Sequence, residues 1–77
     1  MKEVRNLLKT VYPNLDLEMK LNRYTVKSLS EAAGIQYMTL YNKVKTGKNL
    51  TMDEALKIKE TLGTELIVEE LFKKAVS

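Results

Sequence analysis

The sequence of 77 residues predicts a compact all-α fold of five to six helices. Apolar residues recur at spacings of three and four along most of the chain, as they do in helices that bury one face. Thr51 and Glu54 match the capping box that opens a helix, in which each side chain accepts a hydrogen bond from the other residue's backbone N–H. No segment has the period-two alternation of a half-buried strand, and the one strand-like stretch is the short apolar run 66–68.

The N-terminal part of the chain is expected to form two helices separated by a turn. A short amphipathic helix over residues 2–11 is predicted by the i, i+3, i+4, i+7 spacing of Val4, Leu7, Leu8 and Val11. The only proline, Pro13, disfavours helical angles at Tyr12, and Asn14 is expected to cap a second helix over residues 15–23. Two alternative stripes of this second helix can face inward: Leu15 with Met19, or Leu17 with Leu21.

The middle of the chain predicts two helices joined by a short turn. Thr25 is expected to cap a helix over residues 26–33, and Gly34 is expected to end it. The next helix begins after Gln36 and ends near residues 46–47. Its inward residues are Leu40 and Val44, with Tyr37 and Tyr41 on a neighbouring stripe.

The C-terminal part predicts one more full helix and a short closing one. The full helix follows the capping box and ends at Gly63, with Ala55, Ile58 and Leu62 on its buried face. The closing helix is indicated by Val68, Leu71 and Phe72. We expect one domain over residues 1–77, made of an extra N-terminal helix and turn (1–13), a core (14–72) and a basic tail (73–77).

The composition argues against several classes of function. Without cysteine or histidine, the chain lacks thiolate metal ligands, disulfides and the commonest general base, so we expect no enzyme activity, no metal and no cofactor. No apolar run approaches the roughly 20 residues that span a bilayer, and the N-terminus lacks the apolar stretch of a signal peptide. The expected location is therefore the cytoplasm.

Charge is distributed unevenly along the chain. Residues 20–48 carry six basic side chains and one acidic side chain, a net charge of +5. Residues 49–72 carry two basic and six acidic side chains, a net charge of −4, before Lys73 and Lys74. A basic middle beside an acidic end suits a protein with one surface that meets a polyanion, although small domains also segregate charge by chance.

The residues around Gly34 form a pattern that helical periodicity alone does not require. Two helices that cross at a steep angle need a small residue at their closest approach, a turn residue that accepts positive φ, and apolar residues on both sides. Ser30 and Gly34 meet the first two needs. The full set is Leu29, Ser30, Ala33, Gly34, Ile35 and Leu40, with Val44 one helical turn further on.

With this pattern, residues 25–72 resemble the Cro and phage-repressor type of helix-turn-helix domain, the xenobiotic-response-element or lambda repressor-like family, and especially small regulators of Gram-positive phages or prophages. The resemblance extends to residues 12–15, and its motifs are 25–35, 40–44, 50–58 and 69–72. The sequence departs from the family at Ser30, where alanine is usual, and at Arg23, where glycine or asparagine is common. A buried serine is tolerated if its hydroxyl finds a backbone partner, and the turn at Arg23 is expected to differ.

The resemblance implies a transcription regulator, such as a repressor, that binds double-stranded DNA at a palindromic operator as a homodimer. In this motif the second helix lies in the major groove and its N-terminal residues meet base edges. The expected base contacts are Gln36, Tyr37, Met38, Tyr41 and Asn42. Glutamine and asparagine pair with adenine and methionine suits the thymine methyl, so A·T pairs are favoured. The alternatives are that either tyrosine packs half-buried on the preceding helix or that Met38 fills the core.

Residues that flank this helix are expected to contact phosphates, with a solvated surface as the alternative for any single lysine. They are Thr25, Lys27, Lys43, Lys45, Lys48 and Asn49. The dimer contact is expected either in residues 2–11 or around Ile67, Val68 and Phe72. An alternative function is a protein-interaction module, an antirepressor or modulator, that keeps the fold and uses the acidic stretch 53–70.

Overall fold

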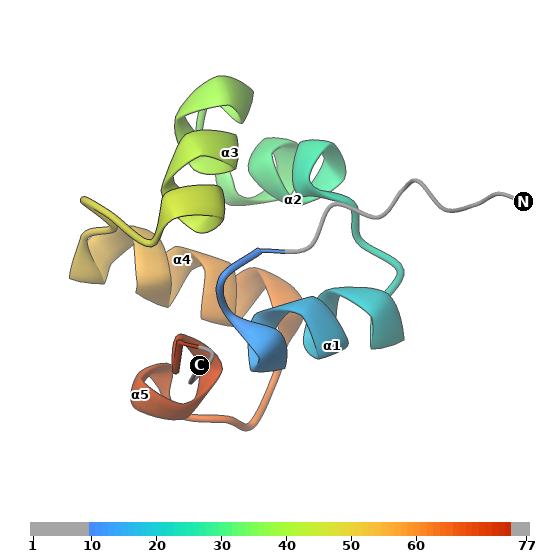
Figure 1. The fold of residues 1–77 in the computed structure, drawn as a ribbon. Helices are drawn as coiled ribbons and strands as arrows, with labels where there is room; N and C mark the ends of the chain where they lie inside the picture. Colours follow the sequence, from blue (N-terminus) through green and yellow to red (C-terminus); the bar gives the residue numbers. More distant parts are fainter. Residues whose placement is uncertain (1–9, 75–77) are drawn as a thin grey trace, which may run out of the picture.

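The computed structural model describes residues 10–74, which contain five helices and no strand (Figure 1). The helices are α1 (Pro13–Leu21), α2 (Val26–Ala33), α3 (Tyr37–Thr46), α4 (Met52–Leu62) and α5 (Val68–Leu71). The predicted all-α fold is confirmed. Each helix in this part of the chain is too short or too polar to cross a membrane.

The entry into α1 differs from the prediction. Pro13 occupies the first helical position, which suits a residue without an N–H, and Tyr12 is the N-cap. Asn14 therefore lies inside the helix and does not cap it; instead, its side-chain Nδ2 donates to the carbonyl oxygen of Glu70 at 2.7 Å. Of the two alternative stripes, the one containing Leu15 and Met19 faces inward.

The segment before α1 corrects a second prediction. Residues 10–11, the end of the helix expected over 2–11, are not helical, and the rest of that helix lies outside the described residues. The backbone N–H of Val11 donates to the carbonyl oxygen of Val44 at 3.0 Å. Thr10 donates to the Asp16 carboxylate from its N–H at 3.0 Å and from its hydroxyl at 2.9 Å. The contact between Val11 and Val44 holds the segment beside the C-terminal half of α3.

Helix α1 ends earlier than expected, at Leu21 rather than Arg23. Arg23 adopts a left-handed conformation with φ of 61°, which redirects the chain toward α2. Glycine and asparagine adopt positive φ more easily than other residues, so arginine holds this left-handed backbone at an energetic cost.

The starts and ends of α2, α3 and α4 agree with the prediction. Thr25 and Ser28 form a capping box at α2, and Thr51 and Glu54 form one at α4. The three helices end at glycines with φ of 73°, 71° and 68°, respectively. Local capping signals thus mark five of these six helix ends, while Gln36 at the start of α3 makes no side-chain cap hydrogen bond.

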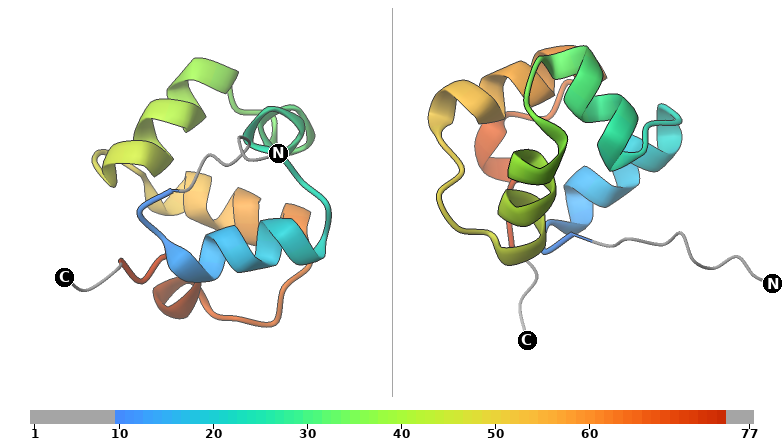
Figure 2. Two further views of the ribbon diagram at one scale, coloured as in Figure 1. Left: turned by 45° about the vertical axis from the view of Figure 1, so that its right-hand side comes forward. Right: turned by 90° about the horizontal axis from the view of Figure 1, so that it is seen from above.

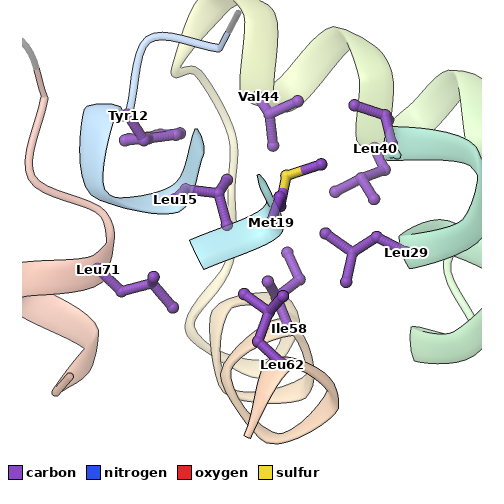
Figure 3. Packing of buried hydrophobic residues seen from close by; sticks show 10 residues of the cluster. Tyr12, Leu15, Met19, Leu29, Leu40, Val44, Ile58, Leu62 and Leu71 are labelled. Atoms are coloured by element: carbon purple, nitrogen blue, oxygen red, sulfur yellow. The ribbon is translucent and has the colours of Figure 1, made fainter. Parts of the chain in front are cut away.

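The core is formed by side chains from all five helices (Figure 3). The least exposed large side chains are those of Leu15, Leu29, Leu40, Ile58 and Leu71. Complete burial of one such leucine contributes about 1.5–3 kcal/mol. Helix α2 packs against α3 and α4, while α5 packs against α4 and α1. The orientation of α3 is therefore set by buried contacts of Leu40 and Val44.

Candidate nucleic-acid interface

The turn between α2 and α3 has the construction that the sequence predicts. Gly34 adopts φ of 73°, and the N–H of Ile35 donates to the carbonyl oxygen of Ser30 at 2.9 Å. Ser30 is 1% exposed, and its hydroxyl donates to the carbonyl oxygen of Lys27 at 2.6 Å. Serine is thus accommodated at this position with its polar group satisfied. Leu29, Leu40 and Val44 are also buried, whereas Ala33 and Ile35 are partly buried.

The outer face of α3 presents the N-terminal side chains that were expected to contact bases. Gln36 and Asn42 are exposed, Tyr37 is 38% exposed and Met38 is 51% exposed. Met38 therefore does not fill the core. Tyr41 is partly buried against the core and lies next to Tyr37, with ring centroids 5.9 Å apart. One edge of this face is consequently aromatic.

A contact at the start of α3 was not anticipated from the sequence. The Thr39 hydroxyl donates to Oε1 of Gln36 at 2.7 Å. Because the two residues are three apart on one helix, their spacing is the signal that could have suggested the contact. The hydrogen bond restrains the Gln36 amide at the N-terminus of α3.

Polar and basic side chains lie on both flanks of this face. At the α2 flank, Thr25 is exposed and Lys27 lies 5.9 Å above the centroid of the Tyr37 ring. Lys27 also lies 4.0 Å from Glu31 in an exposed ion pair. At the other flank, the end of α3 and the following loop carry the exposed residues Lys45, Lys48 and Asn49. Asn49 has φ of 65°, a conformation that asparagine tolerates.

Lys43 differs from the other expected phosphate contacts. Its ammonium donates to both carboxylate oxygens of Glu54, at 2.9 and 2.8 Å, and the two side chains are only 21% and 20% exposed. Burial alone would raise the pKa of Glu54, but the hydrogen bonds from Lys43 and Thr51 and the charge of Lys43 outweigh it. The pKa of Glu54 therefore lies below its ordinary value of 4.5.

Part of the charge separation along the sequence is also a separation in space, although Glu54 of the acidic stretch pairs with Lys43 of the basic stretch. Helices α3 and α5 lie on opposite sides of α4 (Figures 1 and 2). The exposed acids Glu69 and Glu70 belong to α5, whereas Lys45 lies in the last turn of α3 and Lys48 in the loop that follows it. A polyanion that approached α3 would thus meet the basic side of the molecule.

The arrangement agrees with one comparison with known proteins. The family model for the Cro/C1-type HTH DNA-binding domain matches residues 14–73. Comparisons with curated proteins and with solved structures gave no significant match.

Proposed function

The chain belongs to the Cro/C1-type helix-turn-helix DNA-binding domain family, and from that membership we propose that it is a transcription regulator that reads specific double-stranded DNA with α3 in the major groove. The observation that carries the proposal is the division of α3 into two faces. Leu40 and Val44 anchor the helix in the core, while Met38 and Asn42 point away from it. A helix held in this way presents a defined set of side chains to a groove.

We assign direct base contacts to the N-terminal and outer residues of α3. Gln36 and Asn42 are suited to adenine, and the exposed Met38 is suited to the thymine methyl. Tyr37 and Tyr41 complete the set along the aromatic edge. Each well-placed contact discriminates against a wrong base by about 1–3 kcal/mol. We therefore expect an operator with A·T pairs at the positions that α3 reads.

Phosphate contacts on the two flanks would set the position of α3 in the groove. On one flank we assign them to Thr25, at the N-terminus of α2, and to Lys27. On the other flank we assign them to Lys45, Lys48 and Asn49. Lys43 is left out of this set because its ammonium already binds Glu54. These contacts would supply most of the affinity that does not depend on sequence.

We further propose that the protein acts as a homodimer on a palindromic operator, because one recognition helix covers only a half-site. The patch around Ile67, Val68 and Phe72 is a candidate contact. Ile67 is 57% exposed there, whereas the Phe72 ring packs edge-on against Tyr12 with centroids 5.1 Å apart. Ile67 is therefore the residue of this patch most available to a second copy.

Selection of bound duplexes from a random pool tests the proposed function. We expect a palindromic motif whose half-sites are separated by about 34 Å, and an affinity that falls steeply between about 50 and 200 mM salt. A pool without any motif, together with an affinity that does not change with salt, would contradict the proposal. That outcome would favour the protein-interaction module instead.

A further inference from the structure

The ion pair between Lys43 and Glu54 connects the C-terminal half of α3 to the first turn of α4. The ammonium bridges both carboxylate oxygens at 2.8–2.9 Å, and about four fifths of each side chain is removed from solvent. The Lys27–Glu31 pair differs in both respects, since its atoms are 4.0 Å apart and its side chains are 72% and 69% exposed. Exposed pairs of that kind contribute little, whereas removing one partner of a partly buried pair leaves a charge that water compensates only in part.

Glu54 is itself held in place by the start of α4. Its Oε1 accepts a hydrogen bond from the Thr51 N–H at 3.0 Å, and its own N–H donates to the Thr51 hydroxyl at 3.1 Å. The carboxylate that receives Lys43 is therefore fixed to the α4 backbone by a capping box. A movement of α3 away from α4 that exceeds the reach of the Lys43 side chain would break this contact.

Lys43 is adjacent in sequence to two residues with different tasks. Asn42 lies on the exposed face of α3, and Val44 is buried in the core. Because the helix is rigid over one turn, the tether between the Lys43 ammonium and α4 restrains the rotation of the exposed face, in addition to the buried contacts of Val44. We propose that Glu54 is a positioning residue for DNA recognition, which holds α3 in the orientation for base contact through Lys43. The inference rests on the function proposed above.

Whether DNA affinity rises or falls when the charge of Glu54 is removed separates a positioning role from a purely electrostatic one. Glu54 carries a negative charge, so its removal should strengthen binding to any DNA if only long-range charge matters. Positioning predicts the opposite for the specific site, because a small misplacement of the exposed face weakens several base contacts together. Glu54→Gln is a suitable test, since glutamine also completes a capping box, while the negative charge and one of the two oxygens that accept from Lys43 are lost.

The experiment compares the duplex selected by the wild-type protein with a scrambled duplex of the same length and composition. Affinities are measured by fluorescence anisotropy at several salt concentrations, at a temperature where circular dichroism shows every variant folded. For Glu54→Gln we expect about a tenfold loss on the selected duplex, comparable with one lost base contact, and equal or tighter binding to the scrambled duplex. Lys43→Arg, which keeps the charge pair, should retain most of the discrimination. Thr51→Ala removes the hydroxyl that caps α4 but keeps both charges and the backbone N–H that binds the Glu54 carboxylate, so it is the matched control for stability and should also retain the discrimination.

Two results would overturn the inference. Tighter or unchanged binding of Glu54→Gln to both duplexes would mean that Glu54 merely neutralises Lys43. A further variant, Lys43→Gln, removes the basic charge; if it alone loses affinity, on both duplexes and with the salt slope reduced by about 0.9, Lys43 contacts a phosphate and Glu54 does not position α3.

Amide hydrogen exchange without DNA gives a readout that does not depend on the proposed function. We expect Glu54→Gln to accelerate exchange in the C-terminal half of α3 while α2 remains protected. Unchanged exchange would overturn the inference. A wild-type protein that selects no motif would contradict the proposed function, whereas the exchange data would still report on whether Glu54 holds α3.

Discussion

The Ser30 hydroxyl donates to the carbonyl oxygen of Lys27 at 2.6 Å, within a side chain that is almost completely buried. The contact is local, because the acceptor lies one helical turn earlier in α2. Ser30 therefore meets its hydrogen-bonding need without a partner from another helix. Its size is then the property that matters where α2 packs against its neighbours.

The change in stability when Ser30 is substituted should consequently depend on the volume of the new side chain more than on its polarity. Ser30→Ala is expected to change the free energy of unfolding by less than about 1 kcal/mol. The hydroxyl is removed together with its hydrogen bond to Lys27, so no buried donor is left unpaired. Ser30→Leu is expected to lower it by about 1–3 kcal/mol or more through overpacking. Urea unfolding followed by circular dichroism measures both. Equal losses for the two variants would show that the hydroxyl, not the volume, is decisive.

The turn between α1 and α2 can be stabilised by relieving its backbone. Arg23 has φ of 61°, which costs a non-glycine residue energy, although glycine loses more entropy on folding. Arg23→Gly is therefore expected to raise the free energy of unfolding by up to about 1 kcal/mol. Lys20→Gly, within the last turn of α1, is the control and should lower it by about 1 kcal/mol. A loss for Arg23→Gly would mean that the arginine side chain makes a stabilising contact.

Two glycines with nearly the same φ should respond differently to alanine. A Cβ at Gly34 would meet no atom within 4 Å, whereas one at Gly47 would lie 2.9 Å from Cγ2 of Val11 and 2.8 Å from Cε of Lys74. Gly34→Ala should cost about 1 kcal/mol from backbone strain alone. Gly47→Ala should cost more, because Val11 is also tied to Val44 by its backbone. Thermal unfolding of both variants measures the difference, and equal costs would contradict it.

Most of the fold was predictable from sequence because its signals are local. Five of the six boundaries of α2, α3 and α4 follow from two threonine caps and three glycines, which act on their own helix ends. The path of residues 10–11 was not predictable, because it depends on the distant acceptor Val44. Helical spacing alone also could not choose between the stripes of α1, since both have the same period.

In the candidate site, too, the features set by local sequence were predictable and those that depend on distant contacts were not. The Gly34 turn and the exposed face of α3 follow from a continuous stretch of sequence. The pairing of Lys43 with Glu54 joins residues eleven apart on two helices, and it depends on how the core rotates them. From sequence alone, Lys43 could not be distinguished from its basic neighbours. A charge pattern along the chain thus cannot predict which residues on different helices form an ion pair.

Acid should weaken the fold partly through Glu54. Because the pKa of Glu54 is lower in the folded protein than its ordinary value of 4.5, the folded state favours the carboxylate. Its contribution is fully present above pH 4.5 and is lost as the pH falls through the folded pKa. We expect the stability difference between wild type and Glu54→Gln to shrink below that pH in urea titrations. A difference that stays constant from neutral to acidic pH would contradict this assignment.

Base contact and phosphate contact should be separable by two alanine variants. Gln36→Ala removes an exposed amide at the start of α3, so we expect a change in which duplexes are preferred, with a loss of about 1–3 kcal/mol on the original motif. Lys48→Ala removes one flanking charge, so all duplexes should weaken similarly and the salt slope should fall by about 1. Selection followed by salt titration distinguishes the two effects, with Lys57→Ala, an exposed lysine on α4, as the charge-matched control. Identical losses on every duplex for Gln36→Ala and Lys48→Ala would show that α3 does not read bases through its N-terminus.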